Sequence, residues 1–361
     1  MSIKKLLLSA LLLTTTGFAY AQDNCVKLAE GGVIVATVDD SDEGKINLDL
    51  YNDQDWCAMQ FDLYLPENVT FPERGWRTVT SRLKYYDPDE DDDVNFTIAT
   101  NPQADGAIRF VIYNVLNEPI QGNSGDPILK LRFIANDQVS TGKLPVIIKN
   151  VILSNSVDTS TGTAVVSGFN AEKQETDVTV KINAKVGKGG YGSFSWPRDV
   201  VFGDDVEVFT ATSEPKNGWL HLEPITDKKV PAGTGVFIKG TEYATVNPET
   251  TTEELAKITS TLGQTSTAPY EASAGVFVLA TKNEKTALYP VGDGVTIPQY
   301  KAYVTGESGA KFIALGDTAT SIDALDMAEE EGDIYTLGGQ KVQKTTMKGV
   351  YIKNGKKVVV K

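Results

Sequence analysis

The chain has 361 residues, a formal net charge of −14 and an apolar content of 41%. This length accommodates two or three ordinary domains, and the apolar content is too high for a chain that is disordered overall. The acidic balance argues against a nucleic-acid partner, because neutralising phosphates requires clustered lysine and arginine. The composition therefore predicts folded domains whose partner is not a nucleic acid.

Residues 1–21 have the pattern of a secretory signal peptide. Lys4 and Lys5 precede an apolar run over residues 6–13, and Ala19 and Ala21 form the small-x-small pattern of a cleavage site. The apolar run is too short to span a membrane, and no later stretch is comparably apolar. We expect a secreted protein, in the medium or on the outer cell surface, without a transmembrane segment.

Residues 22–184 have the pattern of successive short β-strands. In the clearest one, apolar residues or cysteine occupy every second position from Cys57 to Leu65, and Pro66 ends the run. Similar alternation recurs at residues 46–50, 108–112 and 129–133. Strands at this spacing, with no helical period between them, predict an antiparallel β-sandwich.

Five segments in this domain carry a family resemblance. They are residues 48–52 (LDLYN), 58–71 (AMQFDLYLPENVTF), 106–114 (GAIRFVIYN), 120–135 (IQGNSGDPILKLRFIA) and 144–155 (LPVIIKNVILSN). Their order resembles the cohesin-type sandwich, a fold shared with several bacterial carbohydrate-binding modules. The resemblance implies a binding module for a polysaccharide or a surface protein. A cohesin's usual partner is a dockerin, whose paired calcium loops this chain lacks.

Residues 185–191 are rich in glycine and lysine, and we expect them to form a linker to a second β-domain over residues 192–320. Within that domain, residues 231–239 (PAGTGVFIK) resemble residues 271–279 (EASAGVFVL). We interpret the two segments as paired strands of one domain.

Two further features mark the second domain. The apolar spacing over residues 251–261 predicts its one short helix. The sequences around residues 231–239, 275–280 and 297–304 (IPQYKAYV) are similar to a β-domain that recurs in secreted proteins of the Bacteroidetes. That resemblance implies no particular activity.

The C-terminal part changes charge abruptly. Residues 321–333 form an acidic hinge, whereas residues 334–361 contain seven lysines and no acidic residue. Turn pairs at 338–339 and 354–355 predict a β-hairpin tail of two or three strands. The tail resembles the C-terminal domain by which Bacteroidetes proteins are exported through the type IX secretion system. It is short and lacks an upstream Asn-Pro strand, so a capping hairpin is the alternative.

No catalytic constellation is evident, and we predict neither an enzyme nor a catalytic residue. Residues 122–127 place Ser124 between glycines as in a serine protease, but the only histidine, His221, lies after it rather than before it. His221 alternates with leucines, which predicts a place on the polar face of a strand. Two cysteines and one histidine do not make a usual zinc set.

Two small side-chain groups leave alternatives open. Asp87, Asp89 and Asp91 lie in an acidic run that is the one candidate cofactor site, for calcium, but the run lacks the glycine and glutamate of an EF-hand loop. A solvated loop is the alternative. Cys25 and Cys57 either form a disulfide, as exported chains allow, or Cys57 is an apolar strand residue.

Four aromatic residues are the candidate ligand-binding residues: Trp56, Tyr64, Trp76 and Tyr113. Flat aromatic rings stack on sugar rings, which favours a non-catalytic carbohydrate-binding protein, although for each tryptophan taken singly packing under loops is the favoured interpretation. The alternatives are a structural or adhesion protein that binds another protein, and an accessory or divergent glycan-degrading hydrolase. The sequence indicates no oligomeric state.

Overall fold

A computed structural model describes most of the chain. The described residues are 24–36, 45–52, 55–114, 116–155, 157–158, 163–164, 167–171, 173–316, 334–336, 341–342, 349–353 and 356–360. The predicted signal peptide, the acidic hinge and the two turns of the tail lie outside these residues. The chain divides into two compact units, Met1–Lys181 and Ile182–Lys361.

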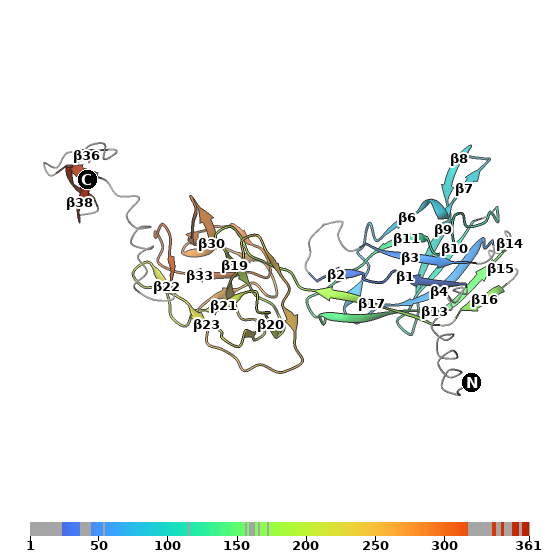
Figure 1. The fold of residues 1–361 in the computed structure, drawn as a ribbon, viewed down its shortest axis with the longest axis horizontal. Coiled ribbons are helices and arrows are strands. Elements are labelled where there is room, and N and C mark those ends of the chain that lie inside the picture. Colours follow the sequence, from blue (N-terminus) through green and yellow to red (C-terminus); the bar gives the residue numbers. More distant parts are fainter. Residues whose placement is uncertain are drawn as a thin grey trace, which may run out of the picture. The chain divides into compact units, whose positions relative to one another are not determined.

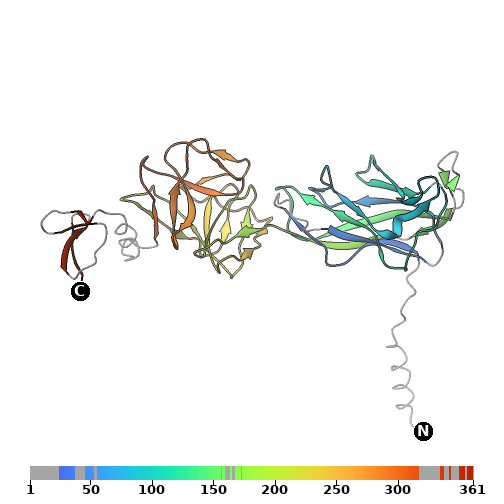
Figure 2. The same ribbon diagram turned by 90° about the horizontal axis from the view of Figure 1, so that it is seen from above.

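The first unit is a β-sandwich, as predicted, and its two sheets are visible in Figures 1 and 2. The smaller sheet has the order β1 (Cys25–Leu28), β3 (Lys45–Tyr51), β11 (Pro127–Arg132) and β6 (Arg77–Val79). The larger sheet has the order β2 (Val33–Val35), β17 (Gln174–Lys181), β13 (Gly142–Ser154), β4 (Ala58–Tyr64), β10 (Ile108–Tyr113) and β9 (Thr97–Pro102). A seventh strand, β16 (Ser167–Ala171), also pairs with β13, and only the β2–β17 pair is parallel among these strands.

The alternating pattern of β4 places its apolar residues in the core. Met59, Phe61 and Leu63 are buried, and the ring of Phe61 stacks on Phe110 of β10 at a centroid distance of 4.8 Å. The smaller sheet contributes buried Leu48 from β3 in the same alternating manner. The odd positions of β4 therefore face inward, and its even positions form part of the outer surface of the larger sheet.

Shorter elements complete the first unit. They are β5 (Val69–Thr70) with β12 (Ile134–Ala135), β7 (Lys84–Asp87) with β8 (Asp92–Asn95), β14 (Val157–Asp158) with β15 (Thr163–Ala164), and a 3-10 turn, η1 (Ser81–Leu83). The β7–β8 hairpin stands out from the sandwich in Figure 1. The acidic run is therefore the end of a hairpin.

The second unit contains two copies of one strand arrangement. The first copy, residues 191–239, contains β19 (Tyr191–Phe194), β20 (Val200–Val201), β21 (Glu207–Thr210), β23 (Glu223–Pro224), β24 (Lys229–Val230) and β25 (Val236–Lys239). The second copy, residues 263–305, contains β28 (Gly263–Gln264), β29 (Tyr270–Glu271), β30 (Val276–Lys282), β31 (Lys285–Pro290), β32 (Thr296–Ile297) and β33 (Ala302–Thr305). In each copy the sheet order is first, sixth, third and fourth strand, and the second strand pairs with the fifth.

Backbone hydrogen bonds at the turn before the sixth strand support this equivalence. In the first copy Gly233 N donates to Trp196 O at 2.8 Å, and in the second Tyr300 N donates to Thr265 O at 2.9 Å. Gly233 and Tyr300 have φ values of +70° and +67°, a left-handed conformation that is unusual for tyrosine. The prediction that residues 231–239 and 271–279 form paired strands is wrong. Their strands β25 and β30 do not pair, since β25 is the sixth strand of the first copy and β30 is the third strand of the second.

Further strands of this unit have no counterpart in the repeated arrangement. They are β18 (Ala184–Lys185) with β26 (Thr245–Val246), β27 (Glu249–Thr250) on β20, and β22 (Trp219–His221), which lies within the first copy and pairs in parallel with β34 (Ala314–Gly316). Residues 185–191, predicted to form a linker, fall within the second unit, and Lys185 pairs with Thr245 of β26. Val186 N also donates to Ala244 O at 2.9 Å.

The helix predicted over residues 251–261 is absent, and the segment is irregular. Asp199 holds it in place by accepting hydrogen bonds from Leu255 N at 2.9 Å and from Ala232 N. These tertiary contacts outweigh a weak local helical pattern. None of the described residues forms a helix with the length and apolar character needed to cross a membrane.

The tail forms a small antiparallel sheet in the order β36 (Lys341–Val342), β35 (Ile334–Thr336), β37 (Gly349–Lys353) and β38 (Lys356–Val360). It therefore has four strands rather than the two or three predicted.

Candidate binding face

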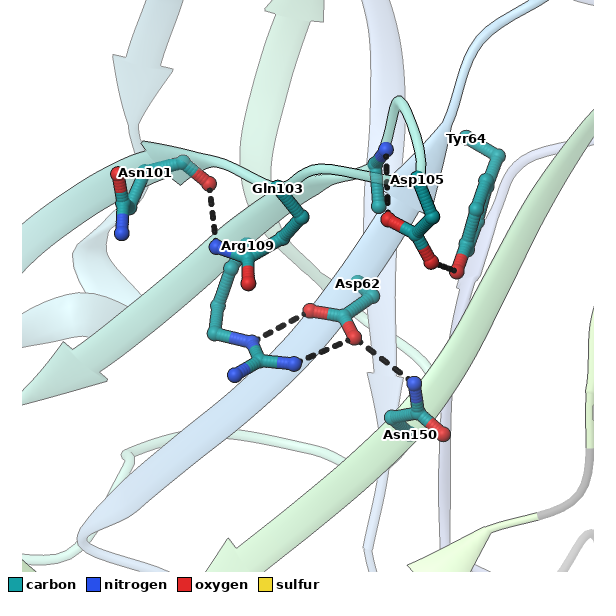
Figure 3. Close-up of polar contacts among 8 residues, drawn as sticks. Asp62, Tyr64, Asn101, Gln103, Asp105, Arg109 and Asn150 are labelled. Atoms are coloured by element: carbon teal, nitrogen blue, oxygen red, sulfur yellow. Dashed lines mark hydrogen bonds and ion pairs between the residues drawn. The ribbon is translucent and has the colours of Figure 1, made fainter.

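The outer surface of β9, β10, β4 and β13 carries a polar network centred on Asp62. We call this surface, with Asn101, Arg109, Asp62, Tyr64 and Lys149, the binding face. Register places Asp62 of β4 directly opposite Arg109 of β10. Arg109 donates from Nε to Asp62 Oδ1 at 2.7 Å and from Nη2 to Oδ2 at 2.8 Å, as Figure 3 shows. This bidentate geometry fixes both side chains.

A β-bulge supplies the third donor to Asp62. The pairing of β13 with β4 shifts register between Lys149 and Ile152, and Asn150 within the bulge has a φ of +53°. Asn150 Nδ2 donates to Asp62 Oδ2 at 2.8 Å (Figure 3). The bulge thus orients an amide toward the carboxylate, a common use of bulges at functional surfaces.

The electrostatics of Asp62 follow from these donors. Its side chain is only 3% exposed, whereas that of Arg109 is 36% exposed. The hydrogen bonds from Arg109 hold the pKa of Asp62 below its usual value, although burial opposes the shift, and Asn150 adds to the lowering. The Asp62 carboxylate is therefore ionised and fully engaged, which suits it to positioning Arg109 and not to proton transfer.

A second contact lies beside the first. Tyr64 donates from its hydroxyl to Asp105 Oδ2 at 2.6 Å, and Asp105 lies in the turn between β9 and β10 (Figure 3). This hydrogen bond lowers the pKa of Asp105 and raises that of Tyr64. Lys149 Nζ lies 4.4 Å from the centroid of the Tyr64 ring, a cation–π geometry. The Tyr64 ring is consequently held at both its hydroxyl and its face.

Chemically, the binding face presents fixed charges and no reactive group. Arg109 Nη1 makes no hydrogen bond to any described residue, so one edge of the guanidinium is open to a partner. Asn101 is exposed beside it, and its backbone oxygen accepts from Gln103 Nε2 at 3.0 Å (Figure 3). Such an arrangement can bind a carboxylate or carbonyl of a ligand with defined geometry.

The two predicted tryptophans are not part of this face. Trp56 is 2% exposed and donates from Nε1 to Asn24 Oδ1 at 2.9 Å, so it cannot stack on a sugar. Trp76 is half-buried, with its ring centroid 5.0 Å from that of Phe71 and the guanidinium of Arg77 lying over it at 4.5 Å. Both tryptophans thus pack against neighbouring side chains, and neither belongs to the binding face.

The other two predicted aromatic residues do lie on the outer surface of the larger sheet. Tyr64 and Tyr113 occupy neighbouring strands, but register places them at opposite ends: Tyr113 pairs with Ala58 at the start of β4, and Tyr64 ends that strand. Tyr113 packs against Cys57 and Ala58. The four candidate residues thus do not assemble one stacking site.

The cysteines do not form a disulfide in this structure. Cys57 is a buried free thiol whose Sγ lies 3.5 Å from both Asn117 Oδ1 and Ser154 O. Cys25 lies at the start of β1 in the other sheet, opposite Tyr51. Both cysteines are buried, and burial raises the pKa of the Cys57 thiol.

The remaining candidate residues have structural positions. Ser124 Oγ accepts a hydrogen bond from Asn52 N at 2.9 Å within a turn, and His221 is exposed at the end of β22, as its alternation with leucines predicted. Asp87 accepts from the backbone of Asp89, and Asp91 accepts from the Tyr86 hydroxyl. Across the described residues, no three His, Cys, Asp or Glu side chains are grouped to hold a metal ion, so the calcium candidates have no assembled ligand set.

Sequence reasoning missed Asp62, Arg109, Asn150, Asp105 and Lys149 as functional candidates. A signal existed for two of them, because Asp62 and Arg109 interrupt apolar strands with opposite charges at non-core positions. Nothing in the sequence indicated the bulge at Asn150.

Neither a protein-family model nor a curated protein matches this sequence. Similar solved structures include a cohesin module of a family 33 glycoside hydrolase from Clostridium perfringens, with 9% identity, 44% of this chain and 97% of that chain covered, and a TM-score of 0.27. A type I cohesin–dockerin complex from Clostridium thermocellum matches with 11% identity over 44% of this chain and 93% of that one, with a TM-score of 0.28. A 35 kDa C-terminal fragment of the major pilin of Streptococcus agalactiae matches with 10% identity over 78% and 90%, with a TM-score of 0.27. These likenesses concern the fold alone.

Proposed function

We propose that the first unit is a non-catalytic recognition module that binds a protein partner through the binding face. The observation that carries this proposal is the fixed Arg109–Asp62–Asn150 network, which presents an open guanidinium edge on a sheet surface. Preorganised charges reduce the entropy lost on binding and restrict the partner to complementary groups. The proposed contact on the partner is a carboxylate or backbone carbonyl facing Arg109.

A protein partner fits this surface better than the polysaccharide favoured by the sequence. Trp56 is buried, the Trp76 ring is covered by Arg77, and Lys149 lies over the Tyr64 ring. Sugar stacking needs an open aromatic face, and these three rings do not offer one. The binding face carries an arginine and a tyrosine, Arg109 and Tyr64, which are residue types enriched in protein interfaces.

The proposed setting is outside the cell. The leader at residues 1–21 and the lysine-rich tail motivate export to the medium or to the cell surface. The chain would then act as a binding or adhesion protein, and a dockerin or another surface protein is the proposed type of partner.

The test measures binding of the full chain, without its leader, to an array of purified dockerins and bacterial surface proteins and to a glycan array. Lys149→Glu reverses a charge on the binding face, and Lys130→Glu makes the same change on β11 of the other sheet. We expect a protein ligand whose affinity falls at least about tenfold with Lys149→Glu and is unchanged with Lys130→Glu. The affinity should also decrease with added salt.

Two results would contradict the proposal. An equal loss of affinity in Lys149→Glu and Lys130→Glu would show that the binding face is not the site of recognition. Binding to glycans alone, with no protein ligand on the array, would return the polysaccharide hypothesis to first place.

A further inference from the structure

A cavity of about 500 Å³ lies in the second unit between the two copies of the strand arrangement. The first copy contributes β19, preceded by the turn of residues 185–188, and the second contributes β30 and the segment leading into β33. The walls are largely apolar and include Val278, Leu279 and Ile297. This size and lining are typical of sites that bind small organic molecules.

All charged residues that line the cavity are positively charged. They are Lys185, Lys188 and Lys301, and the lining, which consists of described residues throughout, contains no acidic residue. This contrasts with the whole chain, in which 48 acidic residues outnumber 34 basic ones. The cavity is therefore a local region of positive charge in an acidic protein, which favours an anionic ligand.

The backbone of Lys301 is held by several hydrogen bonds. Its backbone N donates to Thr265 Oγ1 at 2.8 Å, and its backbone O accepts from Thr265 N at 2.9 Å and from Ser195 Oγ at 3.0 Å. Thr265 and Ser195 are themselves buried. The preceding residue, Tyr300, has the left-handed φ of +67° that directs the chain into this position.

The ammonium of Lys301 has no counter-ion among the described residues. No hydrogen bond or ion pair joins its Nζ to another side chain, and burial, with a smaller contribution from Lys185, lowers the pKa of Lys301. An ammonium in apolar surroundings costs free energy unless an anion accompanies it. A ligand that supplies the anion would recover that free energy.

We propose that this cavity binds a small organic carboxylate with an apolar body, whose carboxylate pairs with Lys301. Ser193, which also lines the cavity, supplies a hydroxyl for the second carboxylate oxygen. The apolar walls take the body of the ligand. This site belongs to the second unit and does not depend on the function proposed for the first.

A carboxylate fits better than a phosphate because the nearby glycine-rich turn does not offer free backbone donors. Gly187 N donates to Tyr191 O, Gly190 N donates to Gly187 O, and Gly189 N donates to Glu242 Oε1. A phosphate-binding loop needs such N–H groups directed at the ligand. One ammonium and one hydroxyl match the two oxygens of a carboxylate.

Binding should also shift the titration of Lys301. A bound carboxylate would raise its pKa toward the ordinary value, so binding should take up protons at pH values above the pKa of the empty site. The other titratable groups lining the cavity are Lys185, Lys188 and Tyr191. Site-specific NMR of the lysine ammonium separates Lys301 from these neighbours.

The experiment titrates the full chain, without its leader, with hexanoate, octanoate and benzoate, followed by calorimetry and lysine NMR. Hexanamide and hexyl phosphate are the matched neutral and phosphate probes. Lys301→Met removes the ammonium, and Lys257→Met makes the same change at an exposed lysine outside the cavity. We expect at least one carboxylate to bind saturably, at least tenfold more tightly than hexanamide, with a tenfold or greater loss in Lys301→Met and none in Lys257→Met.

The proposal would be overturned if none of the three carboxylates bound saturably. It would also be overturned if hexanamide or hexyl phosphate bound as tightly as the carboxylates, or if the affinity for the carboxylate were unchanged in Lys301→Met. The NMR titration does not depend on a folded variant, because it observes the Lys301 ammonium in the unaltered chain. A carboxylate that binds without moving the Lys301 resonances would also contradict the assignment.

Discussion

At the scale of single residues, Asp62 shows how a charge is kept on a sheet surface with almost no exposure. Its carboxylate receives three donors, two from Arg109 and one from Asn150. Each donor replaces a hydrogen bond to water that burial removes. The stability of the ionised form therefore depends on all three contacts, and this dependence can be measured.

Replacing Asp62 with asparagine should destabilise the first unit by about 2 kcal/mol. This is less than the ~3–5 kcal/mol of a fully buried ion pair, because Arg109 is 36% exposed. Urea unfolding monitored by signals of the first unit measures the change. Asp177→Asn, at an exposed position of β17, is the matched control and should change stability by less than about 0.5 kcal/mol.

The same pair predicts a pH dependence with a defined sign. The pKa of Asp62 is lower in the folded chain than its unfolded value near ~4, so its stabilising effect is complete above that value. The effect is lost as the pH falls through the lower, folded pKa. We therefore expect the stability difference between the native chain and Asp62→Asn to be constant above about pH 5 and to shrink below about pH 4. A difference that grows toward acid pH would contradict this assignment.

The positions of some single residues could be predicted from the sequence, and those of others could not. The alternation around Asp62 and Arg109 correctly assigned both to the non-core side of their strands, because side chains in a strand alternate regardless of tertiary context. Trp56 could not be placed in this way, since its partner in the folded chain, Asn24, lies 32 positions earlier. Non-local packing of this kind leaves no local pattern.

At the scale of elements, the first unit was predictable and the second was only partly so. Long alternating runs such as β4 and β10 correspond to strands in the structure. The duplication in the second unit was not recognised, because strands such as β20, β24, β29 and β32 have only two residues each. Their equivalence lies in pairing order, and strands this short show almost no periodicity.

The segment expected to be a linker offers a direct test at this scale. Gly189 has a φ of +85°, and a Cβ added there would lie 1.7 Å from Thr286 Oγ1. Gly233 has a similar φ of +70°, but an added Cβ would meet no atom within 4 Å. Gly189→Ala should therefore cost about 3 kcal/mol, from backbone strain and steric overlap together, whereas Gly233→Ala should cost about 1 kcal/mol from strain alone.

Denaturant unfolding of the second unit distinguishes the two substitutions. A linker would tolerate alanine at position 189 with no loss of stability, so equal stability of Gly189→Ala and the native chain would restore the linker interpretation. An equal loss in both variants would show that backbone strain, rather than contact with the β30–β31 hairpin, governs residue 189.

At the scale of the whole molecule, each unit has its own buried core. In the first unit, Arg82 is 4% exposed and donates to the backbone oxygens of Gln121, Leu50 and Asp126, and to Asn52 Oδ1. In the second unit, Phe237 and Phe277 lie in a common cluster that joins the two copies. Since the two cores share no residues, their unfolding equilibria can be separated by substitution.

We expect the full chain to unfold in two transitions, each of which responds to substitutions in its own unit. Arg82→Met leaves several buried carbonyl groups without a donor and should lower the stability of the first unit by at least about 3 kcal/mol. Hydrogen exchange followed by mass spectrometry, in increasing urea, reports peptides of each unit separately. Arg82→Met should shift only peptides before residue 182, and Gly189→Ala only peptides after it.

A single transition displaced in both units by either substitution would mean that the cores are energetically coupled, since independent domains transmit no such effect. Binding at the sandwich could then alter the affinity of the cavity beside Lys301, whereas separate transitions would confine each ligand's effect to one unit.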